Sequence, residues 1–217
     1  MPEFEDRCRL VLVAPAAESP DALAGLLEGA LSGGDVASVV LPQRDLDDKA
    51  FQDVCATVVP VIQKAGAAAL VSGDTRVAGR VKADGLFVVE NVETLREMIE
   101  KHSPGMIVGG GNAKDRHSAL SIGEAEPDFI FFGKLDGDIK PEPHRKNIAL
   151  AEWWASMVDI PCILMGGADA SHALEMAETG AEFIAFGKAV FEAEESPETV
   201  VSRINATLDE KAPRFED

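Results

Sequence analysis

The sequence predicts an α/β fold, a (β/α)8 TIM barrel built as a single domain by residues 1–217. Three observations lead to this prediction. Short apolar runs alternate with amphipathic segments eight times, the composition does not change along the chain, and the length of 217 residues suits one barrel. A doubly wound open sheet is the structural alternative, but eight units in so few residues favour closure. We expect residues 1–7 and 209–217 to be loose termini.

Eight apolar runs are predicted to be the strands. They are rich in Val, Ile, Leu and Phe and show little polar alternation, which is typical of parallel strands covered on both faces. The runs are residues 8–14, 35–41, 67–72, 85–89, 105–109, 128–133, 161–165 and 182–187.

Apolar residues at three- and four-residue spacing predict the helices between these runs. Pro20 and Pro197 each follow a serine at a helix start, and Gly66 and Gly180 follow helix ends. The predicted helices cover residues 20–31, 47–64, 92–102, 114–123, 147–158, 171–178 and 197–208, with a shorter and weaker helix at 74–82.

The charge excludes two classes of partner. With 38 acidic and 20 basic residues the chain carries a net charge of −18 at pH 7, which opposes binding to nucleic acid and to anionic membranes. We expect a cytoplasmic protein, because the N-terminus lacks the pattern of a signal peptide and no apolar stretch reaches membrane-spanning length. A phosphate site would therefore have to be a locally positive region on this negatively charged protein.

The cysteines and histidines indicate no redox or metal site. Cys8, Cys55 and Cys162 lie far apart in apolar runs, so they are interpreted as reduced core residues. The histidines, which have no metal-binding spacing, are His102, His117, His144 and His172.

Glycines after the last two predicted strands indicate an anion site. Gly166 and Gly167 end the seventh strand, and Gly187 and Lys188 end the eighth. Glycine lets a ligand approach the backbone, whose free N–H groups then bind an anion, and the loops after strands seven and eight are the common phosphate site of this fold. Gly110 and Gly111, after the fifth strand, offer a second open stretch of backbone on the same rim.

The loop after the sixth strand, residues 134–146, is long for a barrel connection and suits a lid that closes over substrate. Lys134 begins it, in an Asp-(apolar strand)-Phe-Gly-Lys pattern that is echoed at Lys188, so both lysines are expected on the rim. Asp136 and Asp138 are interpreted as parts of a solvated turn, since their spacing lacks a complete calcium-loop pattern.

With the strand ends in place, the chain resembles the thiamine-phosphate synthase family and its thiazole tautomerase relatives. The resemblance runs from Leu10 to about Thr207 and is clearest at residues 81–88, 161–168 and 180–190. It implies Mg²⁺ as cofactor and a reaction in which the nitrogen of a thiazole phosphate attacks the methylene of a pyrimidine diphosphate and pyrophosphate leaves.

Residue by residue, the resemblance implies a metal ligand at Asp74 and a lysine for the leaving pyrophosphate at Lys140. It places Gly166, Gly167, Gly187 and Lys188 at the thiazole-phosphate site. Arg44 and Lys134 are the remaining candidate catalytic cations. The departures from the family pattern are Val40 and Pro42 after strand two, where Gln43 and Arg44 can serve with a shifted loop, Val92 at the second acidic metal position, and Gly111 and Ala113 after strand five.

Three functions stay open on this sequence. The first is a divergent thiamine-phosphate synthase. The second is an aldolase-type barrel with a Schiff-base lysine at Lys134, activated by burial among phenylalanines. The third is a non-catalytic relative that binds a phosphorylated ligand.

Trp153 and Trp154 belong either to the core or to a subunit contact, so a homo-oligomer also stays open.

Overall fold

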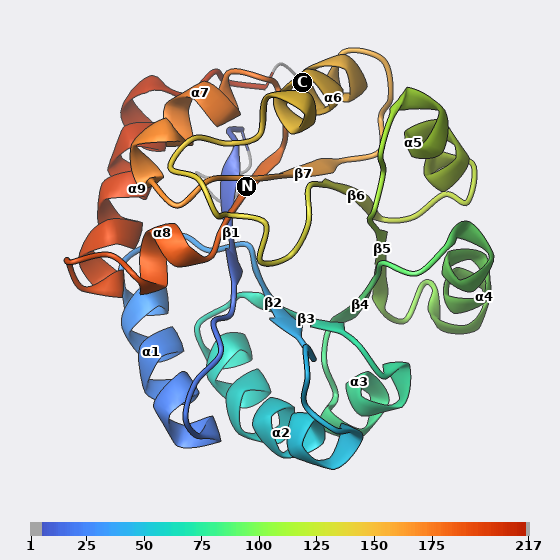
Figure 1. Cartoon of the computed structure of the whole chain (residues 1–217), viewed down its shortest axis with the longest axis vertical. Coiled ribbons are helices and arrows are strands. Elements are labelled where there is room, and N and C mark those ends of the chain that lie inside the picture. Colours follow the sequence, from blue (N-terminus) through green and yellow to red (C-terminus); the bar gives the residue numbers. More distant parts are fainter. Residues whose placement is uncertain (1–5, 216–217) are drawn as a thin grey trace.

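Eight parallel strands close into a barrel in the computed structural model, which describes residues 6–215 (Figure 1). Each strand pairs with its neighbours in sequence, and β1 closes the ring by pairing with β8, where Leu12 lies opposite Phe186. The predicted (β/α)8 barrel is therefore confirmed. The strands are β1 (Arg9–Val13), β2 (Ser38–Pro42), β3 (Ala68–Ser72), β4 (Gly85–Val88), β5 (Ile107–Gly110), β6 (Phe129–Phe132), β7 (Cys162–Met165) and β8 (Phe183–Phe186).

The strands bury side chains on both faces, which explains their continuous apolar runs. On β1, Leu10 and Leu12 join the large core between barrel and helices, whereas Val11 and Val13 point into the barrel. The interior is filled by ten buried side chains, including the rings of Phe87, Phe129 and Phe131. It is thus a packed core, as expected for this fold.

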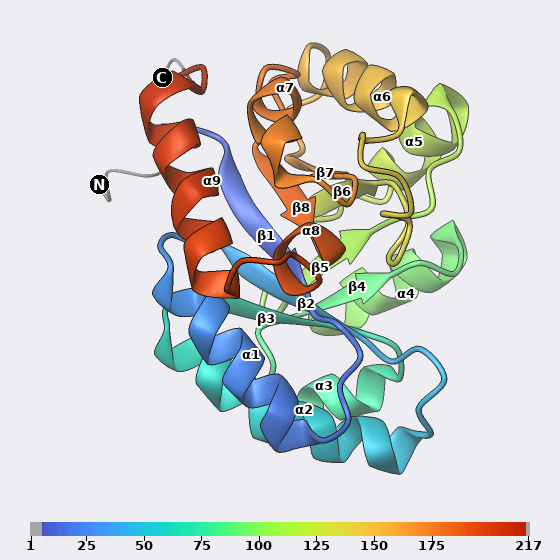
Figure 2. The same cartoon turned by 60° about the vertical axis from the view of Figure 1, so that its left-hand side comes forward.

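Helices surround the barrel close to the predicted places. They are α1 (Pro20–Ser32), α2 (Asp48–Lys64), α3 (Thr75–Val81), α4 (Val92–His102), α5 (Arg116–Gly123), α6 (Arg145–Ala155), α7 (Ala173–Ala177), α8 (Lys188–Phe191) and α9 (Pro197–Lys211), with a 3-10 turn, η1 (Ala170–His172), before α7. Figure 2 shows α9 lying beside α1 on the outside of the barrel.

Several helix boundaries differ from the sequence prediction by one to three residues, and α8 was not among the predicted helices. Helix α6 begins two residues early because the Nδ1 atom of His144 accepts a hydrogen bond from the Lys146 amide and caps the helix. Helix α9 continues to Lys211, where Asp209 accepts a hydrogen bond from Arg7 and the amide of the buried Ala212 donates to the Leu208 carbonyl.

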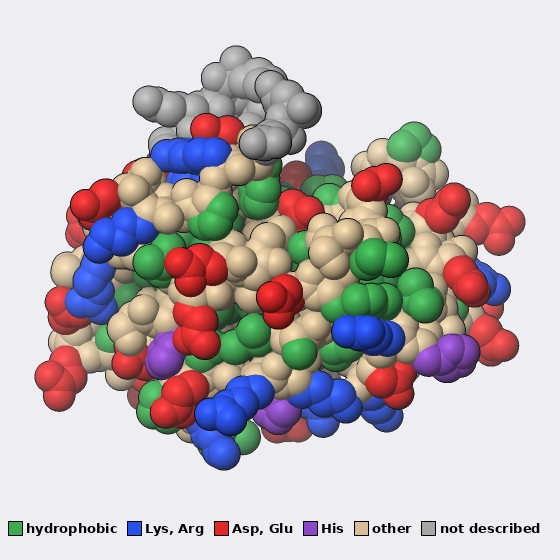
Figure 3. All heavy atoms as spheres, turned by 90° about the horizontal axis from the view of Figure 1, so that it is seen from above, with side chains coloured by type: hydrophobic (Ala, Val, Ile, Leu, Met, Phe, Trp, Pro, Cys, Tyr) green, Lys and Arg blue, Asp and Glu red, His purple; other side chains and the backbone are tan. Residues whose placement is uncertain are grey.

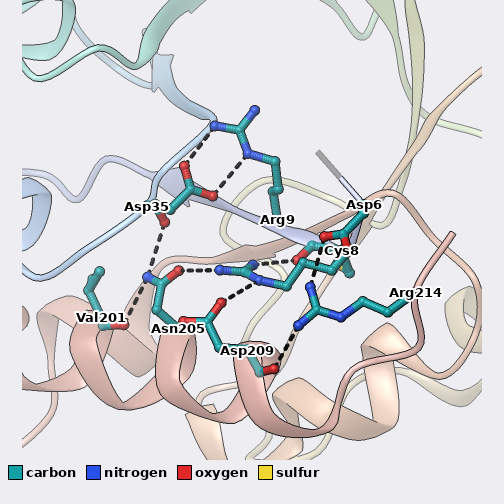
Figure 4. A network of polar contacts seen from close by, with 9 residues as sticks. Asp6, Cys8, Arg9, Asp35, Val201, Asn205, Asp209 and Arg214 are labelled. Carbon is teal, nitrogen blue, oxygen red and sulfur yellow. Dashed lines mark hydrogen bonds and ion pairs between the residues drawn. The ribbon is translucent and has the colours of Figure 1, made fainter. Parts of the chain in front are cut away.

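Polar contacts hold the described parts of both termini at the N-terminal end of the barrel (Figure 4). The buried Arg7 side chain donates to Asp209 Oδ1 at 2.7 Å, to the Cys8 carbonyl at 2.7 Å and to Asn205 Oδ1 at 3.1 Å. The Phe215 amide donates to the Asp6 carbonyl. The expected loose termini are therefore not observed for residues 6–7 and 209–215, while residues 1–5 and 216–217 lie outside the described part.

The three cysteines are reduced and buried, as predicted. Burial raises the pKa of Cys8 and of Cys55 to about 12, so neither thiol ionises near neutral pH.

Within residues 6–215 no helix is both long and apolar enough to cross a bilayer.

Candidate active site at the barrel mouth

The loop of residues 134–146, called the rim loop here, lies across the carboxyl end of the barrel (yellow in Figure 1). Its Leu135 side chain packs onto the residues that fill the barrel interior. The loop therefore covers the end of the barrel at which active sites of this fold are assembled.

An ion pair ties the rim loop to the opposite side of the mouth. Arg44, after β2, donates from Nε to Asp136 Oδ2 at 2.7 Å and from Nη2 to Asp136 Oδ1 at 2.6 Å. Its Nη2 also donates to the Ala14 carbonyl at 2.8 Å. Such two-point pairing of guanidinium and carboxylate is among the stronger side-chain interactions. Arg44 thus reaches the mouth, but its charge is already paired.

The glycine corner, formed by Gly166, Gly167, Gly187 and Lys188, comes together at the ends of β7 and β8. The rim loop fills it. Asp138 Oδ2 accepts a hydrogen bond from the Lys188 amide at 2.6 Å, and a Cβ on Gly187 would lie 2.9 Å from the same oxygen. A larger residue at position 187 would have to displace this carboxylate.

The backbone of the rim loop also accepts hydrogen bonds from the two amides that follow Gly167. Lys140 O accepts from the Ala168 amide at 2.8 Å, and Pro141 O accepts from the Asp169 amide at 3.2 Å. A Cβ on Gly167 would lie 2.1 Å from Pro141 O, so any larger residue would displace the loop.

The interpretation of Asp138 as part of a solvated turn was wrong. Its exposed fraction is 2%, whereas Asp136 is exposed on the same loop. The carboxylate is buried because the Lys188 amide, 50 residues further along the chain, donates to it. Sequence inspection missed this contact, although an acidic residue in a loop bordering an expected anion site was the available indication.

Lys134 and Lys140 line one pocket of about 690 Å³ together with Met165 and Gly166. The structure therefore brings both predicted cations beside the glycine corner. Both lysines are exposed. The burial among phenylalanines on which the aldolase alternative depended is accordingly absent at Lys134.

Gly110 and Gly111 have packing partners. A Cβ on Gly110 would lie 2.7 Å from Leu95 and 2.8 Å from Ile122, outside the barrel, and one on Gly111 would lie 2.6 Å from the ring of Phe87. These neighbours explain the glycines without a ligand, and their contact with a ligand stays a prediction.

The predicted metal ligand Asp74 is held by its own neighbours. It caps α3, and its two carboxylate oxygens accept hydrogen bonds from the Arg76 guanidinium at 2.7–3.0 Å. These hydrogen bonds lower the pKa of Asp74 from 3.8 to about 2. Gln43 Oε1 accepts from the Asp74 amide at 2.8 Å, so the β2 and β3 ends are joined here.

These donors do not fit a Mg²⁺ ion. A guanidinium already neutralises Asp74, and the family resemblance puts an apolar residue, Val92, at the second acidic position. The carboxylate of nearby Glu90 accepts a hydrogen bond from the Val89 amide. Among residues 6–215 no group of three His, Cys, Asp or Glu side chains is arranged to hold a metal ion.

Comparison with known proteins agrees with this geometry. The family model described as thiamine monophosphate synthase matches residues 10–190. The thiamine-phosphate synthase of Rhodospirillum centenum is 30% identical over 202 residues, covering 93% of this chain and 98% of the relative. That of Hyphomonas neptunium is 30% identical over 220 residues, covering 95% and 96%.

A solved thiamine phosphate pyrophosphorylase from Pyrococcus furiosus superposes with a TM-score of 0.78 at 19% identity, covering 96% of this chain and 98% of that one. This structural likeness shows the same fold. The family match covers most of the chain, including every strand from β2 to β8 and the glycine corner. The chain therefore belongs to the thiamine monophosphate synthase family.

Proposed function

We propose that this protein joins a hydroxymethylpyrimidine diphosphate to a thiazole phosphate, as a divergent thiamine-phosphate synthase. The thiazole nitrogen supplies the electron pair of the new carbon–nitrogen bond. The bond between the pyrimidine methylene carbon and the diphosphate oxygen breaks, and its electrons leave on pyrophosphate. Nothing is oxidised or reduced, so the protein contributes positioning and charge neutralisation.

The observation that carries the proposal is the contact between Asp138 and the Lys188 amide. A carboxylate oxygen accepts this N–H at 2.6 Å, which supports the glycine corner as the site of the thiazole phosphate. A phosphate oxygen is, like the carboxylate oxygen, an anionic acceptor for a backbone N–H. Substrate binding at this corner therefore requires the rim loop to withdraw Asp138.

Cations at the mouth support the step in which pyrophosphate leaves. Lys134 and Lys140 line the pocket beside Gly166, and Arg44 borders the mouth from β2. In this proposal Lys134 and Lys140 stabilise the charge on the departing pyrophosphate, and Arg44 joins them when its pairing with Asp136 opens. Each such charged contact is worth about 2–4 kcal/mol in a transition state.

Magnesium enters no step of this proposal, because Asp74 is paired with Arg76. The family resemblance implies Mg²⁺, so the assay below is run with and without it.

A cytoplasmic location is part of the proposal and is supported by the three reduced cysteines.

The test is turnover of both precursors by the pure full-length protein, read by chromatography and mass spectrometry. We expect thiamine phosphate and one equivalent of pyrophosphate. Lys140→Ala should lower kcat by about 10²-fold, whereas Lys101→Ala, an exposed lysine on α4, should leave it unchanged. No product at high enzyme concentration would reject the synthase. Calorimetric binding of thiazole phosphate without turnover would then identify a non-catalytic relative.

A further inference from the structure

Five cationic side chains surround two adjoining pockets on one side of the mouth. The first pocket, of about 690 Å³, is lined by Lys134, Lys140 and Arg145, and the second, of about 360 Å³, by Lys114, Lys134 and Lys146. The pockets adjoin because both are lined by Lys134, Gly137, Ile139, His144 and Asn147. The basic sector is defined here as Lys114, Lys134, Lys140, Arg145 and Lys146.

The basic sector is unusual on an acidic protein. In Figure 3, Lys and Arg side chains gather around a histidine along the lower edge, the side that faces the viewer in Figure 1, with acidic side chains beside them and over the rest of the view. The whole chain has 38 acidic residues against 20 basic ones. In contrast, Glu142 is the only carboxylate among the residues that line the two pockets.

None of the five cations forms an ion pair within 4.0 Å in the described part of the chain. Asp115 lies near Lys146, but its carboxylate accepts the Ser118 amide and hydroxyl at the start of α5. By comparison, Arg44 and Arg76, on the other side of the mouth, are both paired. Unpaired like charges around a concave surface repel one another, and a bound anion relieves that repulsion.

The number and kind of cations indicate the ligand. Lysine ammonium groups act as point charges for phosphate, and an arginine adds a two-point donor. Five cations can neutralise a diphosphate, which carries several charges, whereas one orthophosphate would leave most of them unpaired. Two adjoining pockets that share Lys134 also suit two linked phosphate groups.

We propose that the basic sector binds the diphosphate group of the substrate through side-chain cations, without Mg²⁺. This inference rests on the proposed function, because pyrophosphate is the leaving group of that reaction. The sector lies beside the glycine corner, since Lys140 contributes its side chain to the pocket and its carbonyl to the Ala168 amide. The cations thus take the place of the metal that Asp74, already paired with Arg76, is not free to hold.

Calorimetric titration of the full chain with inorganic pyrophosphate in EDTA tests this site. We expect one pyrophosphate per chain, with an affinity that falls as salt is raised. The double variant Lys140→Ala/Arg145→Ala should weaken binding at least tenfold. The double variant Lys64→Ala/Lys101→Ala, which removes two positive charges outside the pockets, should weaken it less than twofold. Circular dichroism of each variant checks that it is folded.

The outcomes separate this inference from the proposed function. Pyrophosphate binding in EDTA with no synthase product would uphold the basic sector and reject the reaction. Product formation that requires Mg²⁺, with no pyrophosphate binding in EDTA, would overturn the sector and retain the reaction. Binding that is unchanged in the double variant would also overturn it, because the anion would then lie elsewhere.

Discussion

At the glycine corner, the Asp138 carboxylate accepts the amide hydrogen bond that a ligand phosphate is expected to accept. Asp138 is buried, accepts the Lys188 amide at 2.6 Å and lies against Gly187. The sequence predicted the corner from its glycines, because loops after strands seven and eight meet in every barrel of this kind. It did not predict the group that fills the corner, since Asp138 lies 50 residues from Lys188 and nothing local links them.

Removing the charge of Asp138 should therefore strengthen phosphate binding. In Asp138→Asn an amide oxygen replaces a carboxylate, so competition for the Lys188 amide and repulsion of the ligand both fall. We expect the Kd for thiazole phosphate to drop about tenfold, measured by calorimetry. Glu97→Gln, which neutralises an exposed acid on α4, should change it less than twofold. Weaker binding in Asp138→Asn would contradict this role.

The ion pair of Asp74 with Arg76 should appear in the pH dependence of stability. The carboxylate keeps its charge in the folded protein down to a pKa of about 2, below its usual value of 3.8. Its stabilisation is therefore fully present above pH 4 and is lost as the pH falls towards 2. Asn also caps helices well, so Asp74→Asn should cost about 1 kcal/mol at pH 7, since Arg76 is mostly exposed.

Urea unfolding of the wild-type protein and of Asp74→Asn at a series of pH values checks this prediction. The difference in free energy of unfolding should close between pH 4 and pH 2. Asp53→Asn, which breaks an exposed pair with Lys49 on α2, serves as the control and should show little difference at any pH. A constant difference for Asp74→Asn down to pH 2 would exclude the ion pair as its cause.

At the scale of elements, the rim loop is the part that the sequence described least well. Its length predicted a lid, but its path across the mouth depends on contacts with distant elements, among them those of Leu135, Asp136 and Asp138. Strand positions, in contrast, were predicted within a few residues, because each buried strand carries its own apolar run. Local patterns specify elements, whereas a loop is positioned by partners that only the folded chain supplies.

Gly167→Ala should release the rim loop. The new Cβ would lie 2.1 Å from Pro141 O, so the loop backbone must move and its hydrogen bonds to the Ala168 and Asp169 amides must break. We expect hydrogen exchange of these two amides to speed up at least tenfold. Gly25→Ala, in a part of α1 where a Cβ meets nothing within 4 Å, should instead stabilise the protein by about 0.5–1 kcal/mol. Unchanged exchange in Gly167→Ala would show that the loop is held elsewhere.

Over the whole molecule, stabilising contacts and candidate chemistry lie at opposite ends of the barrel. The network around Arg7 joins the start of β1 to α9 at the N-terminal end, while the glycine corner and the basic sector lie at the carboxyl end (Figures 1 and 4). Changes to the first should alter stability and leave the second intact.

Asp209→Ala tests this separation. It removes a 2.7 Å hydrogen bond from a fully buried arginine, so the free energy of unfolding should fall by about 2 kcal/mol. Asp6→Ala, which breaks an exposed pair with Arg214, should cost less than about 1 kcal/mol. Urea unfolding measures both, and turnover per folded molecule should not change in either. Reduced turnover in folded Asp209→Ala protein would mean that the two ends are coupled.

The rings inside the barrel limit how deep a substrate can go. Phe87, Phe129 and Phe131 fill the interior, Leu135 lies over them, and glycines at positions 109 and 111 make room for two of the rings. In the described part of the chain the barrel interior is therefore closed by packed side chains. Reactants that enter the mouth would stop above Leu135 and these rings rather than pass into the barrel.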